Sequence, residues 1–190
     1  MPAIVRAFFI EGEMMTTTAK NFTKGPRKVP IRLIVMHSME SQEKPDTAET
    51  VAKWFGGPTA PQASAHVCVD TNSSVQIVDD QDIAWGAPGA NSDGLHIEMA
   101  GTAAQTRAQW LDTYSTGVLD QAAKVAAAWC KKYSIPAVHL TTAQVADGKT
   151  KGICGHVDVT HAFPKLGNHT DPGANFPWDV FISKVAALLK

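Results

Sequence analysis

The chain has 190 residues, of which 44% are hydrophobic and 18% are charged, the balance of a folded domain with a buried core. Its net charge of −1 provides no basic field that would attract nucleic acid or an anionic membrane. The three cysteines, Cys68, Cys130 and Cys154, form no C-x-x-C pair, which excludes a zinc ribbon or a dithiol redox motif and indicates reduced, buried thiols.

The start of the chain contains one short apolar run, which Arg6 interrupts and which Glu11 and Glu13 end. This run is too short to span a membrane, and it lacks a cleavage site of the secretory type. We therefore expect no signal peptide and no stable membrane insertion. Residues 1–30 are expected to be an N-terminal extension, and 31–190 a single domain.

A buried strand is predicted over 31–37, a continuous apolar run that follows Pro30 and ends at His37. A short helix over 45–57 follows. Asp46 is expected to cap it in a capping box with Glu49. Its apolar positions share one face: Ala48, Val51, Trp54 and Phe55.

Residues 65–70 and 75–79 are predicted to form a β-hairpin around the polar turn 71–74. The next strand is predicted over 94–101, where apolar and polar residues alternate. The alternation divides its side chains between two faces, with Leu95, Ile97 and Met99 on one and His96 and Glu98 on the other.

A long amphipathic helix is predicted over 106–133, with a local irregularity at Gly117. A short strand over 152–156 leads into a loop, and the last helix is expected to start near Pro177. Its buried face is predicted to consist of Phe181, Ile182, Val185, Leu188 and Leu189. Strands and helices mixed in this way predict an α/β domain, a mixed β-sheet with helices packed on it.

The segment 155–173 gathers histidines and aspartates between glycines and prolines. A catalytic zinc ion takes three protein ligands from His, Asp, Glu or Cys and keeps a fourth position for water. His37 and His156 each end a predicted strand, and Asp171 follows across the loop. Spacing alone leaves two interpretations open, a three-ligand zinc site or strand-end histidines that form structural hydrogen bonds.

Five segments carry a resemblance to a known family. They are "VMHSME" (35–40), "SAHVCVD" (64–70), "HIEMAG" (96–101), "GICGHVDV" (152–159) and "HTDPGANFPW" (169–178), in this order. Together they resemble the type 2 N-acetylmuramoyl-L-alanine amidases, zinc enzymes whose relatives include phage amidases and peptidoglycan recognition proteins. The resemblance implies an amidase-like fold and cleavage of peptidoglycan between N-acetylmuramic acid and L-alanine.

Carried over residue by residue, the resemblance implies one zinc ion held by His37, His156 and Asp171. It implies that Glu98 activates the attacking water. The family commonly has a lysine, which stabilises the oxyanion, where this chain has His169. Histidine can still donate a hydrogen bond there, although its charge near neutral pH depends on its surroundings.

Four further residues are expected at the substrate cleft: His66, Trp85, Asn91 and His96. His96 stands where the family often has glycine, and it either lines the cleft or supports Glu98. His66 is equally plausible as a hydrogen-bonded structural histidine, and Trp85 is nearly as plausible in the core.

Several other candidates are expected to have no direct role in the chemistry. His139 and His161 are read as bystanders, and Asp158 as a residue that holds the loop together. The remaining tryptophans are read as core residues: Trp54, Trp110, Trp129 and Trp178.

The function expected from the resemblance is that of a phage endolysin, a monomer that stays in the host cytoplasm until it is released to the cell wall. A bacterial autolysin and a muropeptide-recycling amidase would use the same chemistry. A recognition module that binds peptidoglycan without cleaving it is the competing class. The presence of all three expected ligands and of Glu98 favours an enzyme. The histidine at position 169, in place of the usual lysine, keeps the recognition module open as an alternative.

Overall fold

The computed structural model describes residues 17–190, so the predictions about the first apolar run lie outside the described residues. In chain order, the elements are β1 Phe22–Thr23, β2 Leu33–Ser38, α1 Thr47–Gly56, β3 Val67–Val69, β4 Ser74–Gln76, β5 Ile83–Ala84, β6 Gly94–Met99, α2 Arg107–Trp110, α3 Thr113–Tyr133, α4 Thr142–Ala146, β7 Gly152–Gly155, α5 His156–Ala162 and α6 Trp178–Ala187. None of the helices among the described residues is long and apolar enough to cross a membrane.

The main sheet has five strands in the order β4-β3-β6-β2-β7. Strands β3, β6, β2 and β7 run parallel, and β4 pairs with β3 in antiparallel fashion. The predicted mixed sheet and its hairpin are thereby confirmed. Because parallel strands place their carboxyl ends at one edge, the residues that end β2, β6 and β7 meet there.

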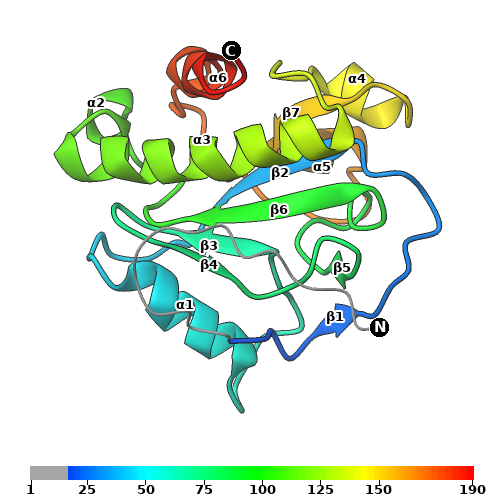
Figure 1. Cartoon of the computed structure of the whole chain (residues 1–190), viewed down its shortest axis with the longest axis horizontal. Helices are drawn as coiled ribbons and strands as arrows, with labels where there is room; N and C mark the ends of the chain where they lie inside the picture. Colours follow the sequence, from blue (N-terminus) through cyan, green and yellow to red (C-terminus); the bar gives the residue numbers. More distant parts are fainter. Residues whose placement is uncertain (1–16) are drawn as a thin grey trace.

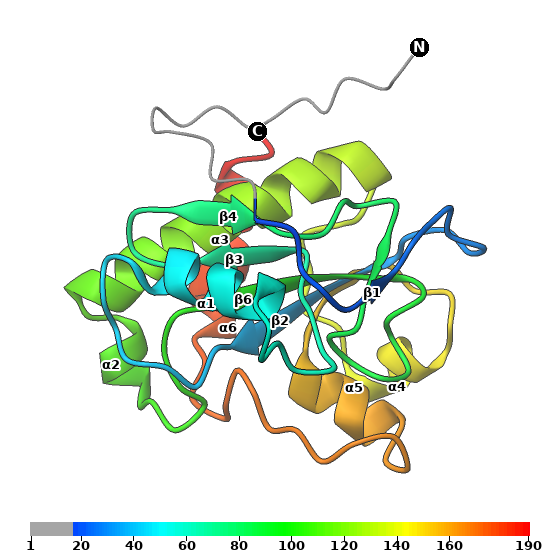
Figure 2. The ribbon, with the colours of Figure 1, turned by 90° about the horizontal axis from the view of Figure 1, so that it is seen from below.

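Helices cover both faces of this sheet. Helices α3 and α6 lie over one face (Figure 1) and bury the apolar side of β6, which confirms the predicted alternation of that strand. On the other face, α1 packs on the β3–β4 side, while α4 and α5 lie beside β2 and β7 (Figure 2). Between these helices, the second face carries the polar side chains His37, His96 and Glu98.

The N-terminus of α1 differs from the predicted capping box. The side chain of Asp46 makes no capping hydrogen bond. Instead, the backbone N–H of Ala48 donates to Oδ2 of Asp70 over 2.9 Å, from the end of β3. The buried face also differs from the prediction, because Trp54 is 48% exposed and its place is taken by Ala52.

The long helix predicted over 106–133 is divided into α2 and α3. Asp112 interrupts it, and its side chain accepts a hydrogen bond of 2.8 Å from the N–H of Ser115 at the start of α3. The irregularity is therefore not at Gly117, which is helical. A Cβ atom there would lie 2.9 Å from the carbonyl oxygen of Thr71, so this glycine lets α3 approach the hairpin turn.

Residues 17–30 belong to the folded unit, contrary to the expectation of an extension up to residue 30. Strand β1 pairs with β5, and Ala19 is buried. The guanidinium of Arg27 donates to the carbonyl oxygens of Asp80, Ser92 and Gly94 over 2.8, 2.9 and 3.1 Å. These contacts tie the segment to the loop before β6.

The region after β7 also departs from the prediction. The strand ends at Gly155, and His156 begins helix α5, so the expected loop starts only after Ala162. Helix α6 begins at Trp178, directly after Pro177, as predicted. Its fully buried residues are Phe181 and Val185, whereas Leu188 is 42% exposed.

Candidate active site

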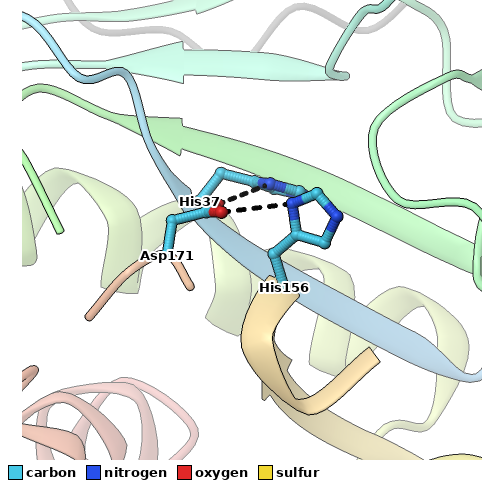
Figure 3. A group of neighbouring side chains, drawn as sticks. All are labelled: His37, His156 and Asp171. Atoms are coloured by element: carbon cyan, nitrogen blue, oxygen red, sulfur yellow. Dashed lines mark hydrogen bonds and ion pairs between the residues drawn. The ribbon is translucent and has the colours of Figure 1, made fainter. Parts of the chain in front are cut away.

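Three side chains converge at the carboxyl edge of the sheet. His37 comes from β2, His156 from the first residue of α5 and Asp171 from the loop before α6 (Figure 3). All three are buried, and one potential ligand atom from each lies within 4.8 Å of the others. Among residues 17–190, this is the group of His, Cys, Asp and Glu side chains with the geometry to hold a metal ion.

The carboxylate of Asp171 lies between the two imidazoles. Its Oδ2 is 3.0 Å from Nδ1 of His37, and its Oδ1 is 3.3 Å from Nδ1 of His156. Burial alone would raise the pKa of Asp171, but hydrogen bonds with His156 and His37 outweigh it and hold the pKa well below the usual range. Burial lowers the pKa of His156, which favours the neutral imidazole that binds metals.

These residues fit a catalytic zinc ion. Two histidine nitrogens and one carboxylate oxygen are a known catalytic ligand set, which leaves a fourth position open. Ligand atoms around a tetrahedral zinc lie roughly 3.3 Å apart, given bonds of about 2.0–2.1 Å. The Nδ1 atoms of His37 and His156 lie 3.0 and 3.3 Å from the two carboxylate oxygens of Asp171, and one potential ligand atom from each residue lies within 4.8 Å of the others, close enough to converge on one ion.

The loop that carries Asp171 is held in place by its backbone. The N–H of Val157 donates to the carbonyl oxygen of Asp171 over 2.9 Å, which joins the loop to α5. Gly173 has a φ of 100° and passes close to the backbone of Ala103. Only glycine combines that backbone angle with so close an approach, which explains the glycine of the T-D-P-G motif.

Glu98 lies on β6 between Cys68 of β3 and His37 of β2, each its register partner. Its Oε2 atom is enclosed and has no hydrogen-bond partner among the described residues. Burial, and then the charges of Asp171 and Glu40, raise its pKa to about 8. A carboxyl group with a pKa near the working pH can both accept and return a proton.

His169 lies at the outer side of the group formed by His37, His156 and Asp171, called the metal group below. Its ring stacks on that of His156 with 4.0 Å between the centroids, and its Nδ1 is 3.6 Å from Oδ1 of Asp171. Burial and the neighbouring His156 lower its pKa. The ring is therefore neutral at pH 7 and lacks the charge of the lysine that is common in the family.

His66 and His96 are both completely buried, so neither ring is open to a substrate. For His66 this favours the structural alternative over the cleft, and for His96 it differs from the expected place in the cleft. Nδ1 of His96 lies 3.1 Å from Nε2 of His37. The backbone N–H of His96 donates to Nδ1 of His66 over 3.0 Å. His96 makes no hydrogen bond with Glu98 among the described residues, and it contacts His37 instead.

The two other expected cleft residues lie in the segment between β5 and β6. Trp85 is 36% exposed, and its Nε1 donates to Oγ1 of Thr23 over 2.9 Å. Asn91 uses its Oδ1 to accept the N–H of Ala87 at 2.7 Å, within its own turn. Trp85 is thus partly exposed, whereas the acceptor of Asn91 is already occupied.

The residues expected to be bystanders lie outside the metal group. His161 is exposed, and Oδ2 of Asp158 accepts the N–H of Gly155 over 2.8 Å at the start of α5. The same carboxylate lies 3.1 Å from Nε2 of His139, whose ring stacks on Trp178. Trp110 and Trp129 are buried in the core.

Sequence reasoning missed Arg27, which lies in the segment read as an extension. Its Nη2 is 2.9 Å from Nε2 of His66, so it reaches the row of histidines behind the metal group. The sequence around Arg27 gives no local signal of this place, because its partners are distant in the chain. They are the side chain of His66 and backbone carbonyls 53 to 67 residues away.

A comparison of the sequence with models of protein families identifies one match. The family model described as N-acetylmuramoyl-L-alanine amidase matches residues 27–174. Among curated proteins, no sequence matches the chain.

Several solved structures share the fold of this chain. A selenomethionine derivative of AmpD has a TM-score of 0.60 at 19% identity, covering 91% of this chain and 92% of that one. Staphylococcus aureus hydrolase AmiA, in complex with its ligand, has a TM-score of 0.58 at 15% identity, covering 82% and 73%. The endolysin amidase LysCS from Clostridium intestinale has a TM-score of 0.56 at 15% identity, covering 90% and 92%. With the family match, the shared fold and the buried ligand set, the chain belongs to the N-acetylmuramoyl-L-alanine amidase family.

Proposed function

We propose that the chain is a zinc-dependent hydrolase of the amide bond between N-acetylmuramic acid and L-alanine in peptidoglycan. The observation that carries this proposal is the buried group of His37, His156 and Asp171 beside the enclosed carboxyl group of Glu98. The family match over 27–174 supports the same reaction.

His37 and His156 would hold the zinc ion through Nδ1, and Asp171 through its carboxylate. When bound, zinc supplies a Lewis acid that polarises the scissile carbonyl and acidifies water. The protein would hold these three side chains in position, because all of them are buried and the backbone of Asp171 is hydrogen-bonded to α5.

Glu98 is the general base and then the general acid. Its carboxylate takes a proton from the attacking water, and the resulting carboxylic acid returns a proton to the departing α-amino group of L-alanine. The raised pKa suits the second step, since a carboxyl group with an ordinary pKa would hold its proton weakly near neutral pH. Among the described residues, Glu98 is the carboxylate that pairs in register with His37; the pairs between β2 and β7 contain none.

His169 is the candidate for stabilising the oxyanion that develops on the carbonyl. It lies beside His156 and Asp171 and is exposed enough to meet a substrate. As a neutral ring it would act through a hydrogen bond alone, which is weaker than a bond from an ammonium group. Trp85 could offer an apolar wall to the peptide or the sugar.

The test is digestion of purified peptidoglycan, analysed by mass spectrometry with and without a zinc chelator. We expect the release of peptides that begin at L-alanine, with loss of release after chelation and recovery on adding zinc. Binding to peptidoglycan without cleavage would instead assign the chain to a recognition module. Cleavage at another bond would show that the reaction is misassigned.

We further propose that the biological setting is that of a phage endolysin, acting as a monomer and held in the host cytoplasm until its release. The fold shared with the endolysin amidase LysCS supports this setting. Expression in a bacterium should then cause lysis only after the inner membrane is permeabilised. Cleavage of soluble muropeptides but not of intact sacculi would favour a recycling amidase.

A further inference from the structure

The imidazole of His37 is contacted at both of its nitrogens. Nδ1 lies 3.0 Å from Oδ2 of Asp171, on the side of the metal group. Nε2 points the other way and lies 3.1 Å from Nδ1 of His96. Among the described residues, that Nε2 forms no other hydrogen bond. The two rings are close, with 5.3 Å between their centroids.

This arrangement matters for metal binding because a histidine ligand is a neutral imidazole. If Nδ1 of His37 donates its lone pair to a metal, the one remaining proton must be on Nε2. His37 is only 2% exposed, so this N–H requires an acceptor inside the protein. Nδ1 of His96 can be that acceptor. Partners of this kind usually orient a metal ligand and fix its tautomer.

We propose, on the basis of the function proposed above, that His96 is a positioning residue of the zinc site. It accepts the Nε2–H of His37 and so presents Nδ1 of His37 to the metal. His96 does not contact the substrate, because its side chain is fully buried.

Beside its contact with His37, the ring of His96 is held on two sides, by His66 and by the backbone at Gly86. It stacks on His66 with centroids 5.6 Å apart and an angle of 9° between the planes, and its backbone N–H donates to His66. Arg27 lies 2.9 Å from the far nitrogen of His66. On the remaining side, a Cβ atom at Gly86 would lie 2.6 Å from Nδ1 of His96, so glycine is needed for the ring to fit.

Folding alone gives little reason for a histidine at this position. Nε2 of His96 is enclosed and has no hydrogen-bond partner among the described residues. An unpaired buried polar atom lowers stability, whereas an apolar side chain of similar size would carry no such cost. Because His96 lowers stability and contacts His37, a role in the metal site explains a histidine here better than core packing does.

The test compares two substitutions with a similarly branched side chain, only one of which carries a hydrogen-bond acceptor. Asn at position 96 keeps an acceptor near the place of Nδ1, while Leu removes it at similar size. Zinc affinity is measured by competition with a chelating dye. We expect His96→Leu to weaken zinc binding by about 10–100-fold, and His96→Asn to stay within about threefold of the parent. His161→Leu, at an exposed histidine, is the matched control and should leave the affinity unchanged.

Gly86→Ala provides a second, independent variant, because it crowds the His96 ring without changing any donor or acceptor. It should weaken zinc binding in the parent and have no further effect in the His96→Ala background. Nitrogen-15 NMR of the zinc-loaded parent should show His37 protonated at Nε2.

The outcomes separate this inference from the proposed function. Equal zinc affinity in the parent, His96→Leu and Gly86→Ala would overturn the role of His96 and leave the zinc amidase intact. A parent chain that binds no zinc would overturn both. Similar weakening by His96→Asn and His96→Leu would also count against the hydrogen bond, since Asn retains the acceptor.

Discussion

His37 and Glu98 lie opposite each other on the adjacent parallel strands β2 and β6. In a parallel pair, residues in register point to the same face, so the proposed metal ligand and the proposed base are brought together by the sheet itself. On the other side of β2, Gly155 of β7 pairs with Met36, which places His156 at the next position along the chain. A shift of one residue in the pairing of β2 with β6 would turn one of the two side chains, His37 or Glu98, to the α3 face.

Replacing Glu98 by Gln should remove most of the activity while zinc content and fold stay unchanged. The amide has nearly the same shape but cannot accept the proton of water, and general base catalysis contributes roughly 10²–10⁴-fold. The rate of L-alanine-terminated peptide release, together with zinc content, checks this. A Glu98→Gln variant that cleaves at the parental rate would show that another group is the base.

Replacing Asp171 by Ala should weaken zinc binding by more than the roughly 10–100-fold that loss of an outer hydrogen bond costs, because a direct ligand is removed. The affinity is measured with the same competing chelator. His161→Ala is the control, since that exposed histidine lies outside the metal group. If His161→Ala weakens binding and Asp171→Ala does not, the third ligand is misassigned.

Replacing His169 by Lys should raise kcat at pH 7. The imidazole is neutral there, because burial and the adjacent His156 lower its pKa. A charged donor is worth about 1 kcal/mol more than a neutral one, which corresponds to roughly five- to tenfold in rate. His169→Leu should lower kcat, with little change in zinc affinity. Unchanged kcat in both variants would exclude any role of this residue in stabilising the oxyanion.

The buried histidines should make the metal-free protein less stable in acid. Burial and the charge of Arg27 lower the pKa of His66 from 6.5 to about 3. Between these values the unfolded chain binds a proton that the folded chain does not, so the free energy of unfolding falls as the pH falls. Each pKa unit corresponds to about 1.36 kcal/mol, so the full loss is on the order of a few kcal/mol.

Urea denaturation of the metal-free chain at pH 7 and at pH 4 measures this loss. In His66→Asn, whose Oδ1 can still accept the N–H of His96, the difference between the two pH values should be smaller than in the parent. An identical difference in the two proteins would mean that His66 does not carry the acid sensitivity.

The sequence was most informative where local pattern and local chemistry coincide. The alternation over 94–101 placed Glu98 on the polar face, and His37 lies near the end of its apolar strand. The motif around Asp171 also contains Gly173, whose backbone angle only glycine adopts readily. Features of this kind depend on neighbours in the chain, so they can be read before the structure is known.

The features that could not be predicted depend on contacts between distant residues. The cap of α1 comes from Asp70, and Trp54 is exposed because Ala52 faces the core. The place of His96 behind His37 follows from the pairing of β2 with β6, not from its own neighbours. Arg27 makes its hydrogen bonds with carbonyls 53 to 67 residues away.

The most direct test of the central claim is a zinc titration of the metal-stripped chain, with release of L-alanine-terminated peptides as the readout. If His37, His156 and Asp171 form one catalytic site, activity should rise linearly and level off at about one equivalent of zinc per chain. The same titration of Asp171→Ala should show no such break. Full activity in the metal-stripped parent, or activity that is independent of added zinc, would contradict the account.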